Sequence, residues 1–432
     1  MTGFDTVGLG LFQRWLPYCP VPPLQSPHGV NSFGIFIIDT TSLPTRKPRD
    51  MTENTSQGAT ELEAPWITQD DLPVTKYQII DENGEYDPAD VPDLDTEEFI
   101  DLYRWMLVEK RYAERMINLQ RRGEMGTVGS SRGHEASIVG SGYALAEDDY
   151  LLAMGRETSA MLMKGVSLRD ILLFWRGIED AQKYLAEQNC MIGISVGGYL
   201  PVVTGIGWGM NITDTDSVVT AHFGDGATST GAFHEAVNFA GVLDAPTIFY
   251  CQNNQWAIST PFEKQTNANS IAQRAVGYGV HGIRVDGNDV LATYHAMSEA
   301  RELALQGNPV LFEGLTYRRE GHSTSDDPTK YRDRDEVEPW LDRDPIERYE
   351  FFLKSEGLWD HVDREAMVAE VDEEFDAAIE AADAYGPRDV EEMFVHLYEE
   401  LPPELEAQLR ELERSLSELD ELDEHIVRRP KG

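Results

Sequence analysis

Two polar motifs follow two apolar runs in the middle of the chain, and their residue types can hold a metal ion. The first, Gly-Asp-Gly, places Asp225 directly after the run 218–223. The second, Asn-Asn, places Asn254 after the run 247–251. Residues 231–243 between them have helical spacing, so the pattern is strand, turn, helix and strand. In a parallel sheet both motifs lie at the carboxyl edge, where open α/β sheets bind ligands.

The oxygen atoms of these motifs suit a hard divalent cation such as Mg²⁺, which takes few ligands from protein and the rest from water and phosphates. Asp225 offers a carboxylate oxygen, Asn254 an amide oxygen and the strand-end backbone a carbonyl. Gly224 and Gly226 remove side-chain bulk, so a diphosphate can approach the main chain. Each motif alone is more often a tight turn or a strand terminator. Their combination around this pattern predicts a metal-diphosphate site.

Gly-Asp-Gly followed at this interval by Asn-Asn resembles the motif of thiamine diphosphate enzymes. Three further segments resemble the alpha subunit of the decarboxylating component of 2-oxo acid dehydrogenase complexes. They are NNQWAISTP, RVDGNDV and GHSTSDDPTKYR. The resemblance covers residues 97–401. It implies oxidative decarboxylation of a branched-chain 2-oxo acid or pyruvate with thiamine diphosphate and Mg²⁺, followed by reductive transfer of the acyl group to a lipoyl group.

The resemblance also implies roles for individual residues of the two motifs. It implies that Mg²⁺ is held by Asp225, Asn254 and the main-chain carbonyl of Trp256. It assigns further cofactor contacts to Gly224, Gly226 and Ala227 of the first motif.

Two arginines are candidates for the diphosphate. Arg156 ends a predicted strand, where a guanidinium group can fork onto a phosphate or form a surface salt bridge. The family carries a Tyr-Arg-Glu triplet here, whose arginine contacts the diphosphate, but Gly155 replaces the tyrosine. Arg318 matches a second arginine that reaches the diphosphate. Two other departures, Thr230 in place of an acid or amide and Gln252 in place of an arginine in some relatives, each predict the loss of a polar contact.

His322 follows the predicted strand 310–316 in a polar, glycine-containing loop. A histidine can be neutral or protonated near pH 7 and so can transfer protons. A lone loop histidine is usually only a surface residue. The resemblance makes His322 the active-site histidine, which assists substrate binding and proton transfer to the lipoyl group. Ser323 matches a serine that is phosphorylated in mitochondrial relatives, although the sequence does not show that a kinase acts on it.

Two more glycine-containing segments precede predicted helices. In 121–145 the glycines imply a loop whose backbone approaches a neighbour closely. His134 and Glu135 at its helix start are either catalytic or, as we expect, surface or dipole partners in the first turn. The segment 193–201 resembles the turn beside the cofactor's aminopyrimidine ring, and its Val196 and small glycines suit contacts to that ring.

The family's cofactor is activated by a glutamate that, in two-chain members, belongs to the beta subunit. The resemblance therefore implies an α₂β₂ heterotetramer, with a lipoyl-bearing acyltransferase as its further partner and a small 2-oxo acid as substrate. Acetoin dehydrogenase, which shares this architecture, is the nearest alternative function. An NAD-dependent oxidoreductase would need a completed glycine fingerprint, which is absent. A non-catalytic cofactor-binding scaffold is disfavoured by the presence of Asp225, Arg318 and His322.

The elements that position these residues predict an α/β protein. Alternating buried strands and helices indicate a doubly wound parallel sheet, and the resemblance makes it a thiamine diphosphate-binding fold with a helical C-terminal region. We expect a helix from Thr96 capped by Asp95 or Thr96, a short strand at 77–80, and a helix at 290–306. Asp286 before this last helix can be a ribose ligand, but we expect a structural turn and cap.

The composition restricts the function. The chain has 432 residues with 77 acidic and 36 basic ones, a formal net charge of −41, and only nine lysines. Acid spread along the whole chain indicates a surface adapted to high salt, as in halophilic proteins, rather than an acidic tail. The absence of a basic patch disfavours nucleic-acid binding. The three cysteines form no paired framework, which suits a reducing cytoplasm, and no apolar run reaches the length of a membrane span.

The two ends of the chain differ from its middle. Residues 1–50 are nearly neutral and proline-rich and show no sustained period, whereas Met51 begins an acidic stretch. We expect 1–50 to be a non-native or disordered extension and Met51 to be the true initiator, which an intact mass of the natively expressed protein would test. The remaining predicted regions are an extended arm at 51–93, the dehydrogenase domain at 94–400, and an acidic helical tail at 401–432.

Overall fold

The structure is a computed structural model that describes residues 69–386 and 389–418. All of them belong to one compact unit within Trp66–Gly432. The predicted extension at 1–50, the predicted start at Met51 and the end of the predicted tail lie outside the described residues. The division into four predicted regions stays a prediction.

Six parallel strands form the central sheet, in the order β2-β1-β3-β4-β8-β7. Their bounds are β1 Tyr150–Ala153, β2 Cys190–Ile192, β3 Val219–Gly224, β4 Thr247–Asn253, β7 His281–Asp286 and β8 Val310–Leu315. A separate antiparallel pair joins β5 Trp256–Ala257 to β6 Thr260–Pro261. The chain passes from β1 outward to β2 and then returns to β3 on the other side of β1. The predicted doubly wound parallel sheet is therefore confirmed, with its switch point between β1 and β3.

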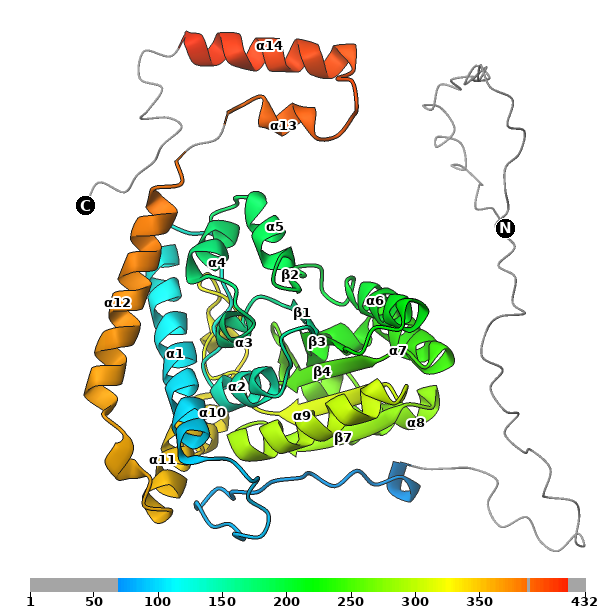
Figure 1. Cartoon of the computed structure of the whole chain (residues 1–432), viewed down its shortest axis with the longest axis vertical. Coiled ribbons are helices and arrows are strands. Elements are labelled where there is room, and N and C mark those ends of the chain that lie inside the picture. Colours follow the sequence, from blue (N-terminus) through cyan, green and yellow to red (C-terminus); the bar gives the residue numbers. More distant parts are fainter. Residues whose placement is uncertain (1–68, 387–388, 419–432) are drawn as a thin grey trace, which may run out of the picture. The chain divides into compact units, whose positions relative to one another are not determined.

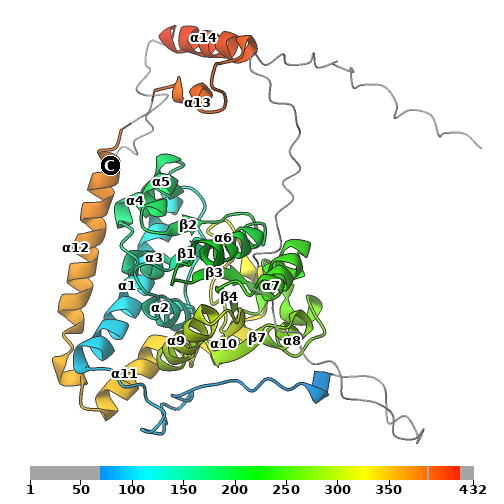
Figure 2. The same cartoon turned by 45° about the vertical axis from the view of Figure 1, so that its right-hand side comes forward.

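Helices cover both faces of this sheet. Those within the sheet region are α2 Glu135–Tyr143, α3 Thr158–Met163, α4 Leu168–Trp175, α5 Asp180–Ala186, α6 Leu200–Thr213, α7 Gly231–Leu243, α8 Ala275–Tyr278 and α9 Val290–Leu305. Alternate residues of β4 pack on opposite faces, because successive side chains of a strand point in opposite directions. Phe249 and Cys251 pack with α6 and α7, whereas Ile248 and Tyr250 pack with α9. Figures 1 and 2 show α6 and α7 on one side of the strands and α2 and α9 on the other.

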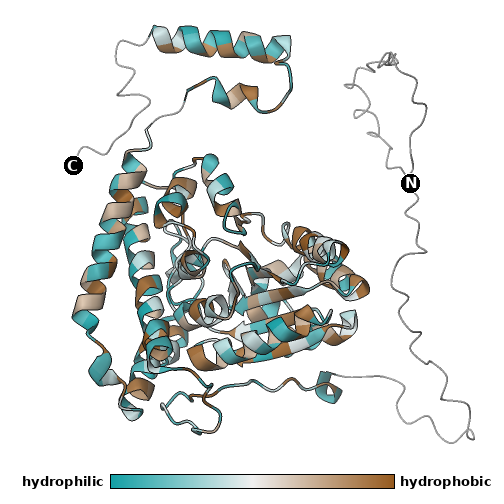
Figure 3. Ribbon diagram, viewed as in Figure 1, coloured by the Kyte–Doolittle hydropathy of each residue, from teal (hydrophilic) through white to brown (hydrophobic). Residues whose placement is uncertain are grey.

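The face of α6 and α7 that points away from the sheet is apolar. Ile212, Phe239 and Val242 are more than half exposed. Figure 3 shows apolar residues along both helices. A cavity of about 370 Å³ opens between them, lined in part by Pro201, Trp208 and Phe239. Glu235 also lines this cavity, but the apolar residues that surround it suit contact with another protein chain.

Helix α1, Thr96–Arg121, begins as the sequence predicts. The Asp95 side chain accepts hydrogen bonds from the Glu97 and Glu98 amides, and Glu98 reaches back to the Asp95 amide, which completes a capping box. The C-terminal region is helical, as predicted. Its helices are α10 Arg334–Leu341, α11 Pro345–Ser355, α12 Arg364–Asp383, α13 Glu392–Val395 and α14 Pro403–Ser417.

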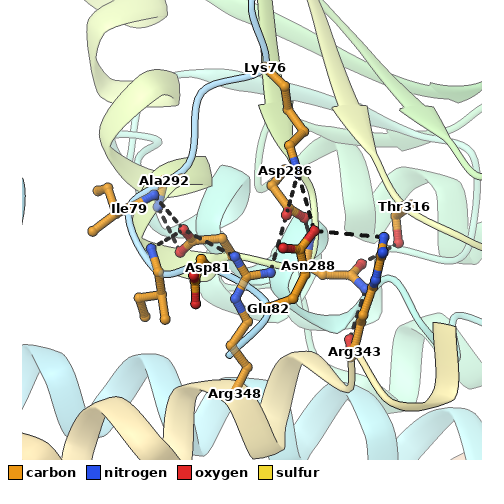
Figure 4. A network of polar contacts seen from close by, with 12 residues as sticks. Lys76, Ile79, Asp81, Glu82, Asp286, Asn288, Ala292, Thr316, Arg343 and Arg348 are labelled. Carbon is orange, nitrogen blue, oxygen red and sulfur yellow. Dashed lines mark hydrogen bonds and ion pairs between the residues drawn. The ribbon is translucent and has the colours of Figure 1, made fainter. Parts of the chain in front are cut away.

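The segment before α1 is attached to the sheet by a polar network at the end of β7 (Figure 4). Asp286 binds Lys76 Nζ at 3.0 Å and Arg348 Nη1 at 3.2 Å. Asp289 caps α9 and also accepts hydrogen bonds from the backbone amides of Ile79 and Ile80, both at 2.7 Å. The expected turn and cap around Asp286 is therefore confirmed.

The prediction of a strand at 77–80 is wrong. Tyr77 makes only an isolated bridge to Val285, because the amides of Ile79 and Ile80 bind the Asp289 carboxylate instead of continuing a ladder. Among the described residues, no helix combines the length and apolar content needed to cross a bilayer. Cys190 and Cys251 are buried free thiols.

Candidate active site

The candidate residues lie at the carboxyl edge of four neighbouring strands. Arg156 follows β1, Asp225 follows β3, Asn254 follows β4, and His322 lies in the loop after β8. These strands are consecutive in the sheet, and β1 and β3 flank the switch point. The topology therefore gathers side chains that are up to 166 positions apart in sequence, as in the hydrogen bond between Arg156 and His322.

Asp225 begins a single 3₁₀ turn, Asp225–Ser229, directly after β3. Its side chain is almost fully buried, and Oδ2 accepts a hydrogen bond from Gln265 Nε2 at 2.5 Å. Burial raises the pKa of Asp225 to about 6, because it outweighs the hydrogen bond from Gln265 and the charges of Arg318 and Arg156. A bound cation would reverse this shift by favouring the charged carboxylate.

The glycines around Asp225 leave room on one side and permit close contact on the other. A Cβ on Gly224 would meet no atom within 4 Å, whereas a Cβ on Gly226 would lie 2.8 Å from the Ala257 Cβ. Ala227 is buried, and its carbonyl accepts hydrogen bonds from the Thr230 amide and hydroxyl. The space beside Gly224 is a cradle that a compact anion could occupy.

Asn254 is held by two contacts at opposite ends of its amide. Oδ1 accepts a hydrogen bond from the Trp256 amide at 3.2 Å, and Nδ2 lies 3.0 Å from His134 Nε2. His134 is fully buried just before α2, so the surface position, one of its two expected roles, is wrong. Burial, followed by the charge of Arg156, lowers the pKa of His134 to about 3. The expectation failed because the partner, Asn254, is 120 positions away and carries no local signal.

Arg156 is buried and joins the loop before α2 to the loop after β8. Nη1 donates to the Ser130 carbonyl at 2.7 Å, and Nη2 donates to His322 Nδ1 at 3.1 Å. Burial, followed by repulsion from Arg318, lowers the pKa of Arg156 to about 10. Two buried guanidinium groups that repel each other favour the binding of an anion between them.

His322 is neutral at pH 7 in this environment. Burial, followed by the charges of Arg156 and Arg318, lowers its pKa to about 4. Because Nδ1 accepts the Arg156 hydrogen bond, the ring proton resides on Nε2. The backbone amide of His322 donates to Asp326 Oδ2 at 2.6 Å, and this carboxylate also accepts from the Tyr331 hydroxyl. These bonds order the loop that carries the ring.

Arg318 is fully buried at the same edge, but its guanidinium group binds acceptors of the protein itself. Nη1 donates to the Trp256 carbonyl at 3.2 Å, and Nη2 donates to the Ile258 carbonyl at 2.6 Å and the Tyr331 hydroxyl at 2.8 Å. It therefore connects the segment after β4 to the loop after β8. The contact between Arg318 and a diphosphate stays a prediction.

The three departures from the family pattern have distinct structural settings. Gly155 has a φ of 109°, and a Cβ there would lie 2.6 Å from Trp175 Cζ2, so an indole ring occupies the space beside this backbone. Thr230 caps α7 by accepting from the Phe233 amide. Gln252 is buried between Gly224 and Gly314 on the neighbouring strands.

Several buried polar groups near the edge have no hydrogen-bond partner among the described residues. They include the whole side-chain amide of Gln252 and Nε1 of Trp175. Buried polar groups are normally paired, so orphaned ones mark places where a ligand can bind. Gln252 thus retains a polar group beside the cradle at Gly224, instead of only removing one as expected.

The donor set fits a diphosphate with one Mg²⁺. The predicted metal ligands comprise a single carboxylate, an amide oxygen and a main-chain carbonyl. The described residues hold no cluster of three or more His, Cys, Asp or Glu side chains. A cation bound by so few protein oxygens takes its other ligands from phosphates and water. The open cradle, the buried acid and the buried arginine supply what such a group requires.

Glu157 is a residue whose role the sequence analysis missed. It is fully buried, and Oε2 accepts hydrogen bonds from the amides of Met154, Gly155 and Arg156 at 2.9, 2.9 and 3.0 Å. The carboxylate therefore shapes the turn that presents Arg156. Its position directly after Arg156 in a conspicuous triplet was the only available signal.

The segment 193–201 leads into α6 and contacts the turn after β3. Gly197 has a φ of 71°, and a Cβ there would lie 2.4 Å from Thr230 Oγ1. Ile194 and Val196 are more than 60% exposed. The predicted contact of this segment with a cofactor ring stays a prediction.

Comparison with known proteins assigns the family. Residues 103–391 match the model of the family described as "Dehydrogenase E1 component". The 3-methyl-2-oxobutanoate dehydrogenase subunit alpha of Mycobacterium tuberculosis is 41% identical over 325 residues, which is 74% of this chain and 88% of the relative. The pyruvate dehydrogenase E1 component subunit alpha of Bacillus subtilis is 37% identical over 336 residues, 77% of this chain and 91% of the relative. The corresponding subunit of Staphylococcus epidermidis is 38% identical over 335 residues, covering 77% and 90%.

The chain belongs to the dehydrogenase E1 component family. The predicted resemblance and enzyme class are thereby confirmed, and the names of the relatives favour the 2-oxo acid dehydrogenase alpha subunit over the acetoin dehydrogenase alternative.

Proposed function

We propose that the chain is the alpha subunit of a 2-oxo acid dehydrogenase that uses thiamine diphosphate and Mg²⁺ and acts on a branched-chain 2-oxo acid or pyruvate. One observation carries the proposal: Arg156, Asp225, Asn254 and His322 follow four neighbouring strands at one edge of the sheet, where the backbone at Gly224 leaves open space. The names of the similar proteins, which include both substrate types, support this choice of substrates.

Different residues of this chain would bind the metal ion, bind the diphosphate and act on the substrate. Asp225, Asn254 and the Trp256 carbonyl would hold Mg²⁺, and Arg156 would neutralise the diphosphate. When bound, thiamine diphosphate supplies the electron sink that decarboxylation of a 2-oxo acid requires. His322 is neutral with its proton on Nε2. This nitrogen can therefore donate a hydrogen bond to the substrate. Proton transfer to the acyl-accepting lipoyl group would first require a second proton on the ring, at Nδ1.

The proposed assembly is an α₂β₂ heterotetramer that delivers its acyl group to a lipoyl-bearing acyltransferase. The printed names of the relatives, which call them alpha subunits, support a beta subunit. The exposed apolar face of α6 and α7 supports burial against another chain.

The purified alpha chain alone should show no decarboxylase activity, whereas co-expression with the beta subunit of the same organism should restore it. Full activity of the lone chain would refute the division of the site between subunits.

The decisive experiment is an assay of the co-expressed enzyme with 3-methyl-2-oxobutanoate, pyruvate and acetoin as separate substrates, monitored by reduction of an artificial electron acceptor. We expect one of the two 2-oxo acids to be oxidised faster than acetoin. Preference for acetoin would overturn the proposal. A His322→Ala variant with unchanged acyl transfer to a lipoyl domain would instead favour a scaffold role for this chain.

We also place the enzyme in a reducing, salt-rich cytoplasm. Free buried thiols and an acidic excess that is spread along the chain support this location. Screening of repulsion between acidic groups should make the protein more stable in molar KCl than in dilute buffer. Thermal unfolding across a KCl series measures this effect, and a lower unfolding temperature at high salt would contradict it.

A further inference from the structure

The buried ring of His134 lies between a main-chain carbonyl and the Asn254 side chain. Nδ1 lies 3.2 Å from the Ser131 carbonyl oxygen, and Nε2 lies 3.0 Å from Asn254 Nδ2. A carbonyl oxygen can only accept a hydrogen bond, so Nδ1 must carry the proton. Nε2 of the neutral ring is then an acceptor. The tautomer is set by a backbone group, independently of Asn254.

The other end of the Asn254 amide is also set by a backbone group. Oδ1 lies 3.2 Å from the Trp256 amide nitrogen, which can only donate. If the amide were turned over, its oxygen would face the lone pair of His134 Nε2 and its NH₂ group would face the Trp256 N–H. Both contacts would be repulsive and both groups are buried, so the two orientations of the amide differ strongly in free energy.

We propose that His134 is a positioning residue that fixes the orientation of the Asn254 side chain and thereby presents Oδ1 to Mg²⁺. The Trp256 N–H uses one lone pair of Oδ1 and leaves the other for a metal ion. This inference rests on the proposed function, because it takes Asn254 as a metal ligand. It assigns no chemical step to His134 itself. The ring acts only through the amide that it holds.

The packing of the elements explains how the His134 ring comes to lie beside Asn254. His134 precedes α2, which packs with α9 on one face of the sheet, and Asn254 directly follows β4. Substitution of a residue that orients a metal ligand typically weakens metal binding by about 10- to 100-fold. A purely structural role of His134 in packing would lower stability without a selective effect on the metal.

The test measures Mn²⁺ binding by electron paramagnetic resonance in the co-expressed alpha–beta enzyme with saturating thiamine diphosphate. His134→Leu removes the acceptor nitrogen and should weaken Mn²⁺ binding by about 10- to 100-fold. His134→Gln offers an acceptor oxygen at a similar reach and should recover most of the affinity. His222→Leu is the matched control, because His222 is also fully buried but bonds to Ser141 instead of a predicted ligand.

The outcomes are distinguishable. Failure of the unaltered enzyme to bind Mn²⁺ and thiamine diphosphate overturns the proposed function and this inference with it. If the original enzyme binds Mn²⁺ and the His134→Leu variant binds it with the same affinity, this inference alone is overturned. Equal weakening in the Leu and Gln variants also overturns it, because the acceptor atom would then be irrelevant. If His134→Leu does not fold, the Gln variant decides: near-original affinity supports the acceptor role, and a loss of tenfold or more refutes it.

Discussion

Two buried polar clusters lie at the same edge of the same sheet and differ in how their charges are paired. At the end of β7, Asp286 lies between Lys76 and Arg348, which are 3.0 and 3.2 Å away, and its pKa lies below the usual range despite burial (Figure 4). At the end of β3, Asp225 has a neutral amide as its hydrogen-bonding side-chain partner, and burial raises its pKa to about 6.

The difference shows which cluster is complete. A carboxylate that already has two cations has no need of a further one, and the β7 cluster tethers the segment before α1. In the cluster around Asp225, burial of the acid outweighs the charges of the two arginines, the arginines repel each other, and the Gln252 amide has no partner among the described residues. Such a cluster is costly in the empty protein, and a ligand that brings both a cation and an anion would relieve the cost.

The same Asp→Asn change in the two clusters should have opposite effects. Asp225→Asn should lower decarboxylase activity by at least about 100-fold through loss of the metal. It should also raise the unfolding free energy of the cofactor-free protein at pH 7.5 by about 1 to 3 kcal/mol, because a buried charge is removed. Activity assays and urea unfolding measure the two quantities.

Asp286→Asn is the matched variant. It should leave cofactor affinity near the original value and lower the unfolding free energy by about 3 kcal/mol, since Arg348 stays buried with weakened pairing. Destabilisation by Asp225→Asn equal to that of Asp286→Asn would contradict the comparison, because both acids would then be structural.

The two buried arginines provide a smaller contrast. Arg156→Gln should weaken thiamine diphosphate binding by about 10- to 100-fold, which corresponds to loss of a charge-assisted hydrogen bond. Arg318→Gln should mainly lower the unfolding free energy, by about 1 to 3 kcal/mol, because two carbonyls and the Tyr331 hydroxyl lose a donor. Calorimetric titration with the cofactor and urea unfolding separate the effects. Weaker cofactor binding in the Arg318 variant alone would restore its predicted diphosphate role.

The smallest expected effect concerns pH. Burial lowers the pKa of His222 to about 3, below its usual 6.5. A histidine with a lowered folded-state pKa contributes stability above the unfolded-state pKa, and this contribution is lost as the pH falls from 6.5 toward 3. When the pH falls from 7.5 to 5.5, the unfolding free energy of the His222→Leu variant should therefore drop by about 1 kcal/mol less than that of the original protein. Urea unfolding at both pH values tests this, and an unchanged difference would show that His222 does not titrate as its burial requires.

Much of the fold could be predicted because periodic hydrophobicity reflects burial directly. Helix α7 has the predicted bounds, and the predicted strand at the start of β4 continues for only two further residues. The predicted strand at 77–80 failed for a specific reason. The amides of Ile79 and Ile80 bind the Asp289 carboxylate, and no local pattern shows that a distant acid will compete for them.

The sequence by itself determined the family, the parallel sheet and the convergence of Asp225, Asn254, Arg156 and His322 on one edge, because motifs at the ends of parallel strands must meet there. Only the tertiary structure decided which groups these side chains contact. It paired His134 with Asn254, turned the donors of Arg318 to protein carbonyls, and placed Trp175 over Gly155. Each of these contacts depends on the relative placement of elements far apart in the chain, and residue type alone carries no information about that placement.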